Sequence, residues 1–392
     1  MASAEPEARG ARMRTFGFGL AGWALGLAIL AVCFRSWPAF HAGIDFNAAP
    51  FEDFAGPYMR QAAAMHGDGH LEAGFLYPPS FALLLAPFAN LSPLAASYAW
   101  LAVLLAATLV LWAAGWWVLR PVSPAVFFAY SLVFALGFPW VHDMHWGQVS
   151  TLCWALILPA LLAWRAGRNG LASLLLSLAI AIKLYPAFFA VLFLLRGDWR
   201  SVLRTAAWSA LWLFGLPALL MGPETMTAFY RDLLHWWRGS AQGLFWESPG
   251  SQFAPLLLHR LWGGPTGILA VLMWALPLGL AAILLRCAWR NGAAGRNNRA
   301  LLLVTCTLPL VISPSWSHYF VWLPWALALA WREFEGLPAR ALLIFAALTM
   351  GTPAFLLVGG HPAYPLMGLL TLAAMAIPLA YFLSPEPPGK AI

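Results

Sequence analysis

The sequence predicts an all-α membrane protein that crosses the bilayer many times. Of its 392 residues, 62% are hydrophobic and only 9% are charged, and the mean hydropathy is +0.74. Because soluble domains carry roughly a quarter charged residues, this chain lacks the side chains needed to cover a water-facing surface. A helix that spans a bilayer needs about 20 mostly apolar residues, and runs of that kind follow one another along the chain.

Ten apolar runs are predicted to span the membrane, although several are shorter than a full crossing. Many of the 23 tryptophans lie near the ends of these runs, where an amphipathic ring suits the lipid headgroups. The first run is longer than the roughly 7–15 apolar residues of a signal peptide, so we expect it to be retained. The predicted spans are residues 15–34, 93–119, 122–140, 149–164, 201–221, 266–286, 300–314, 319–331, 341–358 and 364–383.

Basic residues set the predicted orientation. Three arginines precede the first span, and the positive-inside rule places them in the cytoplasm. The prediction is therefore a multi-pass plasma (inner) membrane protein with a cytoplasmic tail at 1–14, one membrane domain at 15–383 and a cytoplasmic tail at 384–392. The rule also explains the net charge of +7, so we expect membrane lipid as a partner and no nucleic acid.

The predicted orientation requires that two further apolar segments do not span the membrane. Residues 78–91 are bracketed by prolines and are short, which predicts a re-entrant or interfacial helix on the outer side. Residues 171–195 have basic flanks on both sides and Lys183 at their centre. A straight span would bury this lysine at a cost of at least ~2.5–3.5 kcal/mol. A hairpin that turns at 183–186 would instead place Lys183 in a water-filled cavity open to the outside. A kinked single span is the alternative.

The first outer loop carries the candidate catalytic carboxylate. Asp53 opens a predicted helix over 53–65, where a general base can deprotonate an acceptor hydroxyl. Asp45 is the alternative base, and the dipole of a helix N-terminus is a structural reason for a carboxylate at this place. Tyr58 and Tyr77 are candidate substrate contacts.

The most polar island between two apolar runs is residues 142–148. Spacing of three predicts that His142, His145 and Gln148 lie near one helical face, with Asp143 beside them. These side chains suit a phosphate or sugar hydroxyl. Two histidines and an aspartate supply enough ligands for a metal, but their spacing matches no specific metal signature, so no metal site is predicted.

Lys183 is the strongest single signal. Ionisable groups within the membrane are functional by default, and a compact ammonium suits a phosphate. Tyr185 follows it and is a candidate substrate contact. In the later outer segment, His318 can bind phosphate or relay a proton, and Trp316 is a further candidate contact.

A family resemblance rests on the joint order of short motifs over roughly residues 45–330. The motifs are Asp53-Phe54 with Tyr58, Tyr77-Pro78-Pro79, His145-Trp146-Gly147-Gln148, Lys183-Leu184-Tyr185-Pro186, and Ser313-Pro314 through His318-Tyr319. With these, the chain resembles glycosyltransferase family 87 of the GT-C superfamily, which includes polyprenol-phosphate-mannose-dependent mannosyltransferases. Ser150 and Tyr319 stand where the family pattern often has Asn and a second His, which leaves the donor sugar and the acceptor open.

The resemblance implies a GT-C-like bundle of about ten transmembrane helices plus short re-entrant helices, with the active site in extracytoplasmic loops. It implies transfer of a hexose, mannose or another, from a polyprenyl-phosphate donor to a lipid- or glycan-linked acceptor with inversion. Asp53 would be the base, and Lys183, helped by His145 and His318, would bind the donor phosphate and stabilise its developing charge. No cofactor is expected beyond the lipid-linked donor, and the oligomeric state stays open.

Two rival functions share these features. A flippase or transporter of a lipid-linked sugar would use the same lysine, but it needs polar residues along a whole path. The polar residues here gather on one predicted side of the membrane, the outer side, which favours an enzyme over a transporter. A lipid-linked glycan polymerase or ligase differs only in what it transfers, and nucleotide sugars are not favoured because no Rossmann-like fingerprint is present.

Overall fold

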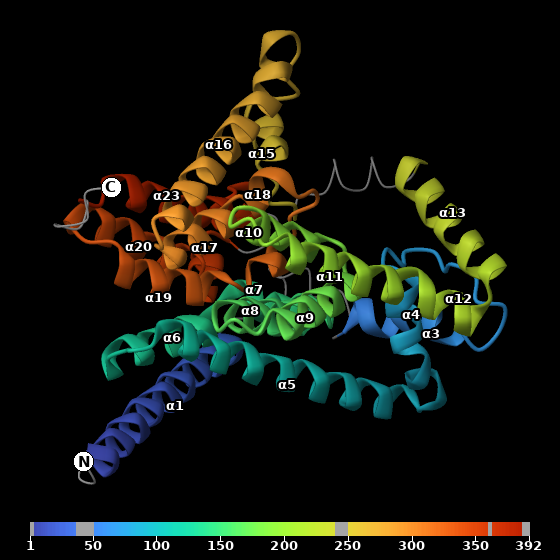
Figure 1. The fold of residues 1–392 in the computed structure, drawn as a ribbon, viewed down its shortest axis with the longest axis horizontal. Coiled ribbons are helices and arrows are strands. Elements are labelled where there is room, and N and C mark those ends of the chain that lie inside the picture. The colour runs from blue at the N-terminus through green and yellow to red at the C-terminus, as the bar shows by residue number, and fades with distance from the viewer. Residues whose placement is uncertain (1–3, 37–50, 240–249, 360–362, 386–392) are drawn as a thin grey trace. The chain divides into compact units, whose positions relative to one another are not determined.

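The structure is a computed structural model that describes residues 4–36, 51–239, 250–359 and 363–385 (Figure 1). All regular elements in these segments are helices, and the β contacts there are two isolated bridges. The predicted all-α class is therefore confirmed. Asp45, the alternative base, and most of the tail 384–392 lie outside the described residues.

Four helical stretches of the described chain are long and apolar enough to cross a membrane. They agree with the predicted runs that begin near residues 15, 93, 201 and 266, and they make the chain a membrane protein by length and composition. The stretches are Met13–Cys33 within α1 (Ala4–Ser36), α5 (Pro93–Leu119), Trp199–Met221 and α16 (Ile268–Ala293), the third being built from α11 (Trp199–Ala210), η4 (Leu211–Gly215) and α12 (Leu216–Met221).

The other six predicted spans correspond to shorter helices. Of these six, only 149–164 follows a single helix, since each of the other five is interrupted; Gly137 ends α6 within 122–140, and Gly351 separates α20 from α21 within 341–358. The breaks at Gly137 and Gly351 pair with each other, and the Phe138 amide donates to the Met350 carbonyl at 2.9 Å. The shorter helices are α6 (Pro124–Leu136), α8 (Ser150–Arg165), α17 (Asn297–Cys306), α19 (Leu323–Glu333), α20 (Leu337–Thr349) and α23 (Leu369–Leu383).

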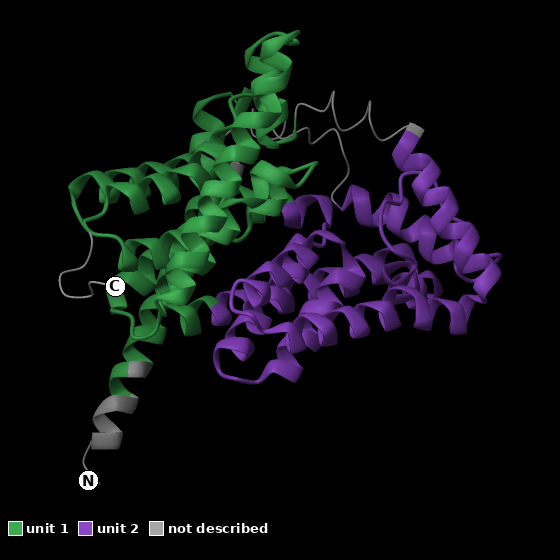
Figure 2. Cartoon of the chain, turned by 45° about the horizontal axis from the view of Figure 1, so that its top comes forward, with its two compact units in different colours: residues 1–47, 115–142, 249–392 green, residues 48–114, 143–248 purple. Residues whose placement is uncertain are grey.

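The chain divides into two compact units (Figure 2). Unit 1 comprises residues 1–47, 115–142 and 249–392, and unit 2 comprises 48–114 and 143–248. The short helices that complete unit 1 are α15 (Ala254–Leu261), α18 (Leu308–Val311), η5 (Ser317–Phe320), α21 (Thr352–Leu357) and α22 (Ala363–Leu366). Unit 2 adds η1 (Phe54–Tyr58), α3 (Met59–Ala64), α4 (Pro79–Leu85), η2 (Ala86–Asn90), α9 (Asn169–Ile182), η3 (Tyr185–Phe189), α10 (Ala190–Leu194) and α13 (Pro223–Gly239), while α7 (Phe138–Trp146) belongs to both.

In unit 1, small residues let α1 approach α6 closely. A Cβ atom on Gly22 would lie 2.4 Å from the Phe128 carbonyl oxygen, and one on Gly26 would lie 2.6 Å from the Ala135 Cβ. Small side chains at such contacts are typical of helices that pack within membranes. Trp23 fills the same interface, with its ring 5.4 Å from that of Phe134.

In unit 2, α8 and α9 lie side by side and α11 packs on α9. The helical turn that begins at Glu52 continues through η1 and α3, and α4 with η2 follows it, so both short helices expected in this region are present. An aromatic cluster joins them to α5, since the ring of Phe54 stacks on Trp100 at 4.9 Å with an interplanar angle of 7°. Tyr58 and Phe81 pack edge to face beside them.

The chain reverses direction between α9 and α10. Asn169, which begins α9, donates from Nδ2 to Oδ2 of Asp198 beyond α10 at 3.2 Å, and Ser173 Oγ donates to the Ser201 carbonyl at 3.2 Å. A continuous helix over these residues would separate its ends by about 40 Å at 1.5 Å per residue. The segment therefore follows the path of a hairpin, and a single kinked span is excluded. Its re-entry into the membrane from one side stays a prediction.

Candidate active site

Asp53 lies in the first turn of the helix that begins at Glu52, and it contacts a glutamine from a distant part of the sequence. The Nε2 atom of Gln148 donates a hydrogen bond to Oδ2 of Asp53. Burial raises the pKa of Asp53 to about 6, although the hydrogen bond from Gln148 and the positive charge of Lys183 both lower it. A half-buried carboxylate whose pKa lies near neutrality is suited to accept a proton.

Gly147 brings Gln148 to this position. Its φ of +66° ends α7, which is a conformation that glycine adopts at little cost. A Cβ atom here would lie 2.8 Å from Cδ1 of Phe51 and 2.9 Å from Cβ of Phe54, so only glycine lets the two segments meet. Trp100 Nε1 also donates to the Gly147 carbonyl at 2.8 Å. Gln148 therefore lies beyond the helix, and its predicted place on one helical face with His142 and His145 is wrong.

Two tyrosines complete the environment of Gln148. Tyr77 donates from its hydroxyl to Oε1 of Gln148 at 3.0 Å, and Tyr58 lies 3.3 Å from the same oxygen. The two hydroxyls are also hydrogen-bonded to each other at 2.6 Å. All three side chains are buried, with exposed fractions of 7% for Gln148 and Tyr77 and 1% for Tyr58. They form a fixed polar cluster in an aromatic surrounding.

Lys183 joins this cluster from the turn between α9 and η3. Its backbone is extended, with φ −151° and ψ 140°, which ends α9. The Nζ atom donates to the Tyr77 hydroxyl at 3.5 Å and lies 5.1 Å from the centre of that ring. A chain of polar groups thus runs from Lys183 through Tyr77 and Gln148 to Asp53. Tyr185, two residues further on, is buried in η3 with an exposed fraction of 9%.

Asp143 holds the start of α8. It is fully enclosed, and its two carboxylate oxygens accept hydrogen bonds from the amides of Ser150 at 3.1 Å and Thr151 at 3.0 Å. Burial raises the pKa of this carboxyl group to about 7. The geometry gives Asp143 a capping role next to Gln148, and the substrate contact expected from the sequence stays a prediction.

His145 is half-buried at the end of α7. Burial lowers the pKa of its imidazole to about 4, so the ring is neutral at pH 7. A neutral imidazole can donate a hydrogen bond to a phosphate but adds no positive charge. The main-chain carbonyl of His145 accepts from the Phe51 amide at 2.7 Å, which fastens α7 to the segment that leads into Asp53.

The remaining sequence candidates lie in unit 1. The rings of His142 and His318 are nearly parallel, with centroids 5.4 Å apart and an interplanar angle of 20°. His318 is buried in η5 with an exposed fraction of 4%. Trp316 precedes η5 and forms an isolated bridge with Ser251. Unit 1 therefore brings these three candidates into one region, whereas unit 2 brings together Asp53, Tyr58, Tyr77, Gln148 and Lys183.

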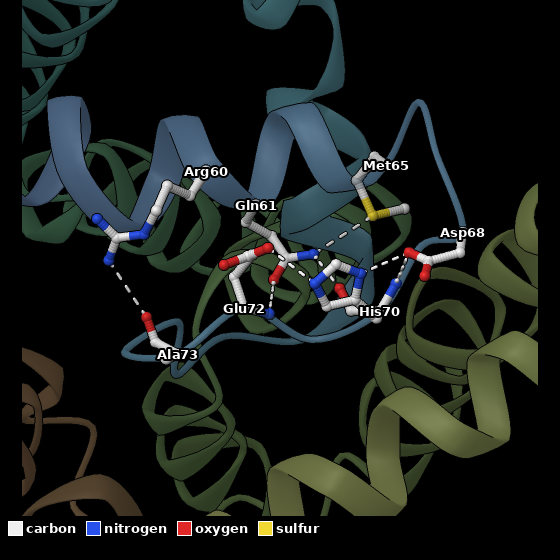
Figure 3. Close-up of polar contacts among 7 residues, drawn as sticks. All are labelled: Arg60, Gln61, Met65, Asp68, His70, Glu72 and Ala73. Atoms are coloured by element: carbon white, nitrogen blue, oxygen red, sulfur yellow. Dashed lines mark hydrogen bonds and ion pairs between the residues drawn. The ribbon is translucent and has the colours of Figure 1, made fainter.

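The loop between the helix of Asp53 and Tyr77 is held in place by hydrogen bonds and ion pairs. Gln61 is fully buried, donates to the His70 carbonyl at 2.9 Å and accepts from the Glu72 amide at 2.9 Å. The His70 ring lies between Asp68, at 2.5 Å, and Glu72, at 2.8 Å, and these carboxylates raise its pKa, the hydrogen bond to Asp68 most strongly. Figure 3 shows these contacts, which join Arg60, Gln61, Met65, Asp68, His70, Glu72 and Ala73.

Two positions that shape the site, Gln61 and Gly147, were not among the predicted site residues. Gln61 lies on a buried helix face and holds the loop at 70–72 by hydrogen bonds. Gly147 has no side chain, which lets the segment of Gln148 approach Phe51 and Phe54. An Asp-x-His-x-Glu pattern at 68–72 was visible, but only the folded loop turns both carboxylates toward the ring. No group of three or more His, Cys, Asp or Glu among the described residues is arranged to hold a metal ion.

Comparisons with known proteins agree on one family. The sequence model of glycosyltransferase family 87 matches residues 75–314, which is more than half of the chain. This segment includes Tyr77, Gln148 and Lys183 and begins after Asp53.

Characterised relatives carry names that specify a reaction. A polyprenol-phosphate-mannose-dependent alpha-(1-2)-phosphatidylinositol mannoside mannosyltransferase of Mycolicibacterium smegmatis is 32% identical over 77% of this chain and 72% of its own length. The protein of the same name from Mycobacterium tuberculosis is 30% identical over 73% of this chain and 70% of its own. A phosphatidylinositol pentamannoside mannosyltransferase of M. smegmatis is 28% identical over 59% of this chain and 52% of its own. A search of the solved structures found no match.

Proposed function

Because this chain belongs to glycosyltransferase family 87, we propose that it transfers mannose from a polyprenyl-phosphate donor to a lipid- or glycan-linked acceptor. Its relatives are named for a polyprenol-phosphate-mannose donor. The described residues include four helices that are long and apolar enough to cross a membrane, and a membrane glycosyltransferase is suited to a lipid-borne substrate. The observation that carries the proposal is the polar chain that links the Asp53 carboxylate to the Lys183 ammonium through Gln148 and Tyr77.

The relatives also suggest which acceptor to test first. Their names specify phosphatidylinositol mannosides. We infer that the acceptor here is a sugar hydroxyl on a lipid-anchored glycan, and that phosphatidylinositol mannoside is the first compound to offer. The rival flippase draws no support from these names.

The reaction we propose is a single displacement. Asp53 takes the proton from the acceptor hydroxyl, the freed oxygen attacks C1 of the mannose, and the bond between C1 and the phosphate oxygen breaks with inversion. The leaving group is a polyprenyl phosphate, which carries the electron pair away. Lys183 faces the charge that grows on this phosphate, where a fixed cation lowers the barrier most effectively.

Other candidates have supporting roles in this proposal. His145, as a neutral ring, donates a hydrogen bond to the donor phosphate, and Tyr185 contacts the sugar. No metal ion enters the scheme, because Lys183 supplies the positive charge at the leaving group. Transfer should therefore proceed at an unchanged rate after treatment with EDTA.

The proposed topology places this chemistry outside the cytoplasm. It has about ten spans in one domain over 15–383, with both tails in the cytoplasm, with 78–91 re-entrant or interfacial on the outer side, and with 171–195 as a hairpin that enters the membrane from the cytoplasmic side. Basic flanks at both ends of 171–195 support it, and so does the hydrogen bond between Asn169 and Asp198 that brings these ends together. Lys183 is then the tip of a hairpin that reaches toward the outer surface.

A reconstituted assay tests the proposal. The purified chain in liposomes is given radiolabelled polyprenyl-phosphate mannose or GDP-mannose, together with phosphatidylinositol mannoside or a series of other glycolipids. We expect a mannosylated lipid from the polyprenyl donor alone. Transfer from GDP-mannose, or movement of labelled donor across the bilayer without any product, would overturn the proposal.

A further inference from the structure

Neighbouring side chains fix the orientation of the Gln148 carboxamide. Its oxygen faces the hydroxyls of Tyr77 and Tyr58, at 3.0 and 3.3 Å, and its nitrogen faces Oδ2 of Asp53. If the amide were turned over, its oxygen would meet the carboxylate oxygen of Asp53, and neither atom could donate. An amide has two donors on nitrogen and only acceptor capacity on oxygen, so the observed orientation is the one that gives the Asp53 carboxylate a donor.

The donors in this cluster all point the same way. Lys183 donates to the Tyr77 oxygen, Tyr77 donates to Gln148, and Gln148 donates to Asp53. Tyr58 is hydrogen-bonded to Tyr77 at 2.6 Å and stands within reach of the same amide oxygen. Hydrogen bonds in a buried chain polarise one another, so the charge of the lysine strengthens the bond that reaches the carboxylate.

We propose that Gln148 is a positioning residue for the catalytic base: it holds Asp53 by Oδ2 alone, with its own amide fixed by Tyr58 and Tyr77, and so reserves Oδ1 for the acceptor hydroxyl. This inference rests on the proposed function, since it assigns a partner to the base of that reaction. It gives Gln148 no contact with the sugar or the phosphate, which is the role that its position near a polar island first suggested.

The chain offers a matched control for Gln148. Gln61 is also a buried glutamine, lies two helical turns beyond Asp53, and makes two 2.9 Å hydrogen bonds to the loop at 70–72 instead of to the base. Replacement of either glutamine by methionine keeps the side-chain volume and removes a buried donor. Both Gln148→Met and Gln61→Met should lower the unfolding temperature of the protein in detergent, but only the first should alter the titration of Asp53.

The decisive measurement is an infrared titration of the Asp53 carboxyl, identified as the band that disappears in Asp53→Asn. A hydrogen bond to the ionised form lowers a pKa, so Gln148→Met should move the titration upward by about one pH unit, while Gln61→Met leaves it in place. In the transfer assay, Gln148→Met should shift the acidic limb of kcat/KM by the same amount and lower kcat about tenfold, with the KM for the donor unchanged.

The tyrosines provide a second test. Because either hydroxyl can reach Oε1 of Gln148, Tyr58→Phe or Tyr77→Phe alone should shift the titration by less than half as much as Gln148→Met. The double variant should shift the titration further than either single variant but less than Gln148→Met, since the amide then loses both hydroxyls that hold its oxygen but still has its donor. Tyr77→Phe also removes a hydroxyl to which Lys183 donates, so its donor KM is compared separately.

The outcomes separate the two proposals. An unshifted Asp53 band in Gln148→Met, or an equal shift in Gln61→Met, would overturn the positioning role whatever the enzyme does. A loss of kcat with no change in the pH profile would do the same, because general damage to the fold produces that pattern. A shifted band in a protein that transfers no mannose would leave Gln148 as the partner of Asp53 and would refute the proposed function alone.

Discussion

At the scale of single residues, Asp53 is under opposing influences. Burial raises the pKa of Asp53 to about 6, while Gln148 and Lys183 act to lower it. A base works best when its pKa lies close to the working pH and when its ionised form still predominates there. The two partners therefore keep the carboxyl group ionised at pH 7 in a place where burial alone would favour its protonation.

The titration of Asp53 predicts the pH dependence of transfer. The ionised form is the active one, so kcat/KM should be level above pH 7 and should fall about tenfold per unit below pH 6. Lys183→Met removes a positive charge that stabilises the carboxylate, so the acidic limb should move to higher pH. A pH–rate profile of purified wild-type protein and of this variant measures both effects.

Asp143 is the control for this assignment, because the pKa of its carboxyl group is also raised, to about 7. Asp143→Asn retains one acceptor oxygen for the amides that begin α8. The acidic limb should stay near pH 6 in this variant. Two results together would contradict the assignment: loss of the acidic limb of the pH–rate profile in Asp143→Asn, and an acidic limb at the wild-type pH in Lys183→Met. They would show that Asp143, and not Asp53, is the base.

At the scale of elements, the turn that ends α7 controls the distance between Gln148 and Asp53. Gly147 has a φ of +66°, which costs other residues about 1–2 kcal/mol, and its Cα hydrogen faces the first turn of the Asp53 helix. Gly147→Ala should therefore lower kcat at least tenfold and reduce the unfolding temperature. Gly167→Ala, also at positive φ but with no atom within 4 Å of the added Cβ, is the matched control and should lose stability without a comparable loss of kcat.

The hairpin of α9 and α10 has a separate test. Because its tip carries Lys183, Lys183→Met should raise the KM for polyprenyl-phosphate mannose by tenfold or more, while Lys183→Arg should recover part of this loss through its retained charge. Leu184→Ala changes an exposed neighbour and should behave like the wild type. Equal donor KM values for Lys183→Met and the wild type would remove the lysine from the phosphate site.

At the scale of the whole molecule, composition was sufficient to predict the helical class, but not the number of long helices. Hydropathy follows residue type and so located the four long apolar stretches. It is blind to Gly137 and Gly351, whose extended backbones interrupt two expected spans and pair with each other. Such breaks depend on a partner that is distant in the sequence, which no local pattern contains.

For the candidate site too, the sequence was sufficient to identify residues but not the contacts between them. Asp53, Tyr58, Tyr77, Gln148 and Lys183 were all singled out as polar groups in apolar surroundings. Their mutual contacts were not, because Gln148 reaches Asp53 only through the positive φ of Gly147. The sequence also could not show that the amides of Ser150 and Thr151 donate to the Asp143 carboxylate, because a buried helix cap and a ligand-binding carboxylate look alike in sequence; a substrate contact at Asp143 stays a prediction.

Cysteine labelling tests the proposed topology of the whole chain. In a protein whose four native cysteines are replaced, single cysteines at Asp68 and Arg196, both exposed, should react from opposite sides of intact cells. A membrane-impermeant maleimide should label position 68, whereas position 196 should need permeabilisation. Labelling of position 196 in intact cells would contradict the re-entrant hairpin and the orientation together.

The most direct test of the central claim is the activity of Asp53→Asn measured beside its affinity for the donor. The substitution removes the proton acceptor but keeps an oxygen and the shape of the side chain. We predict that transfer from polyprenyl-phosphate mannose falls at least 10³-fold, with the donor bound as tightly as by the wild type. Transfer by Asp53→Asn within a few fold of the wild-type rate would show that this cluster is not where the acceptor loses its proton.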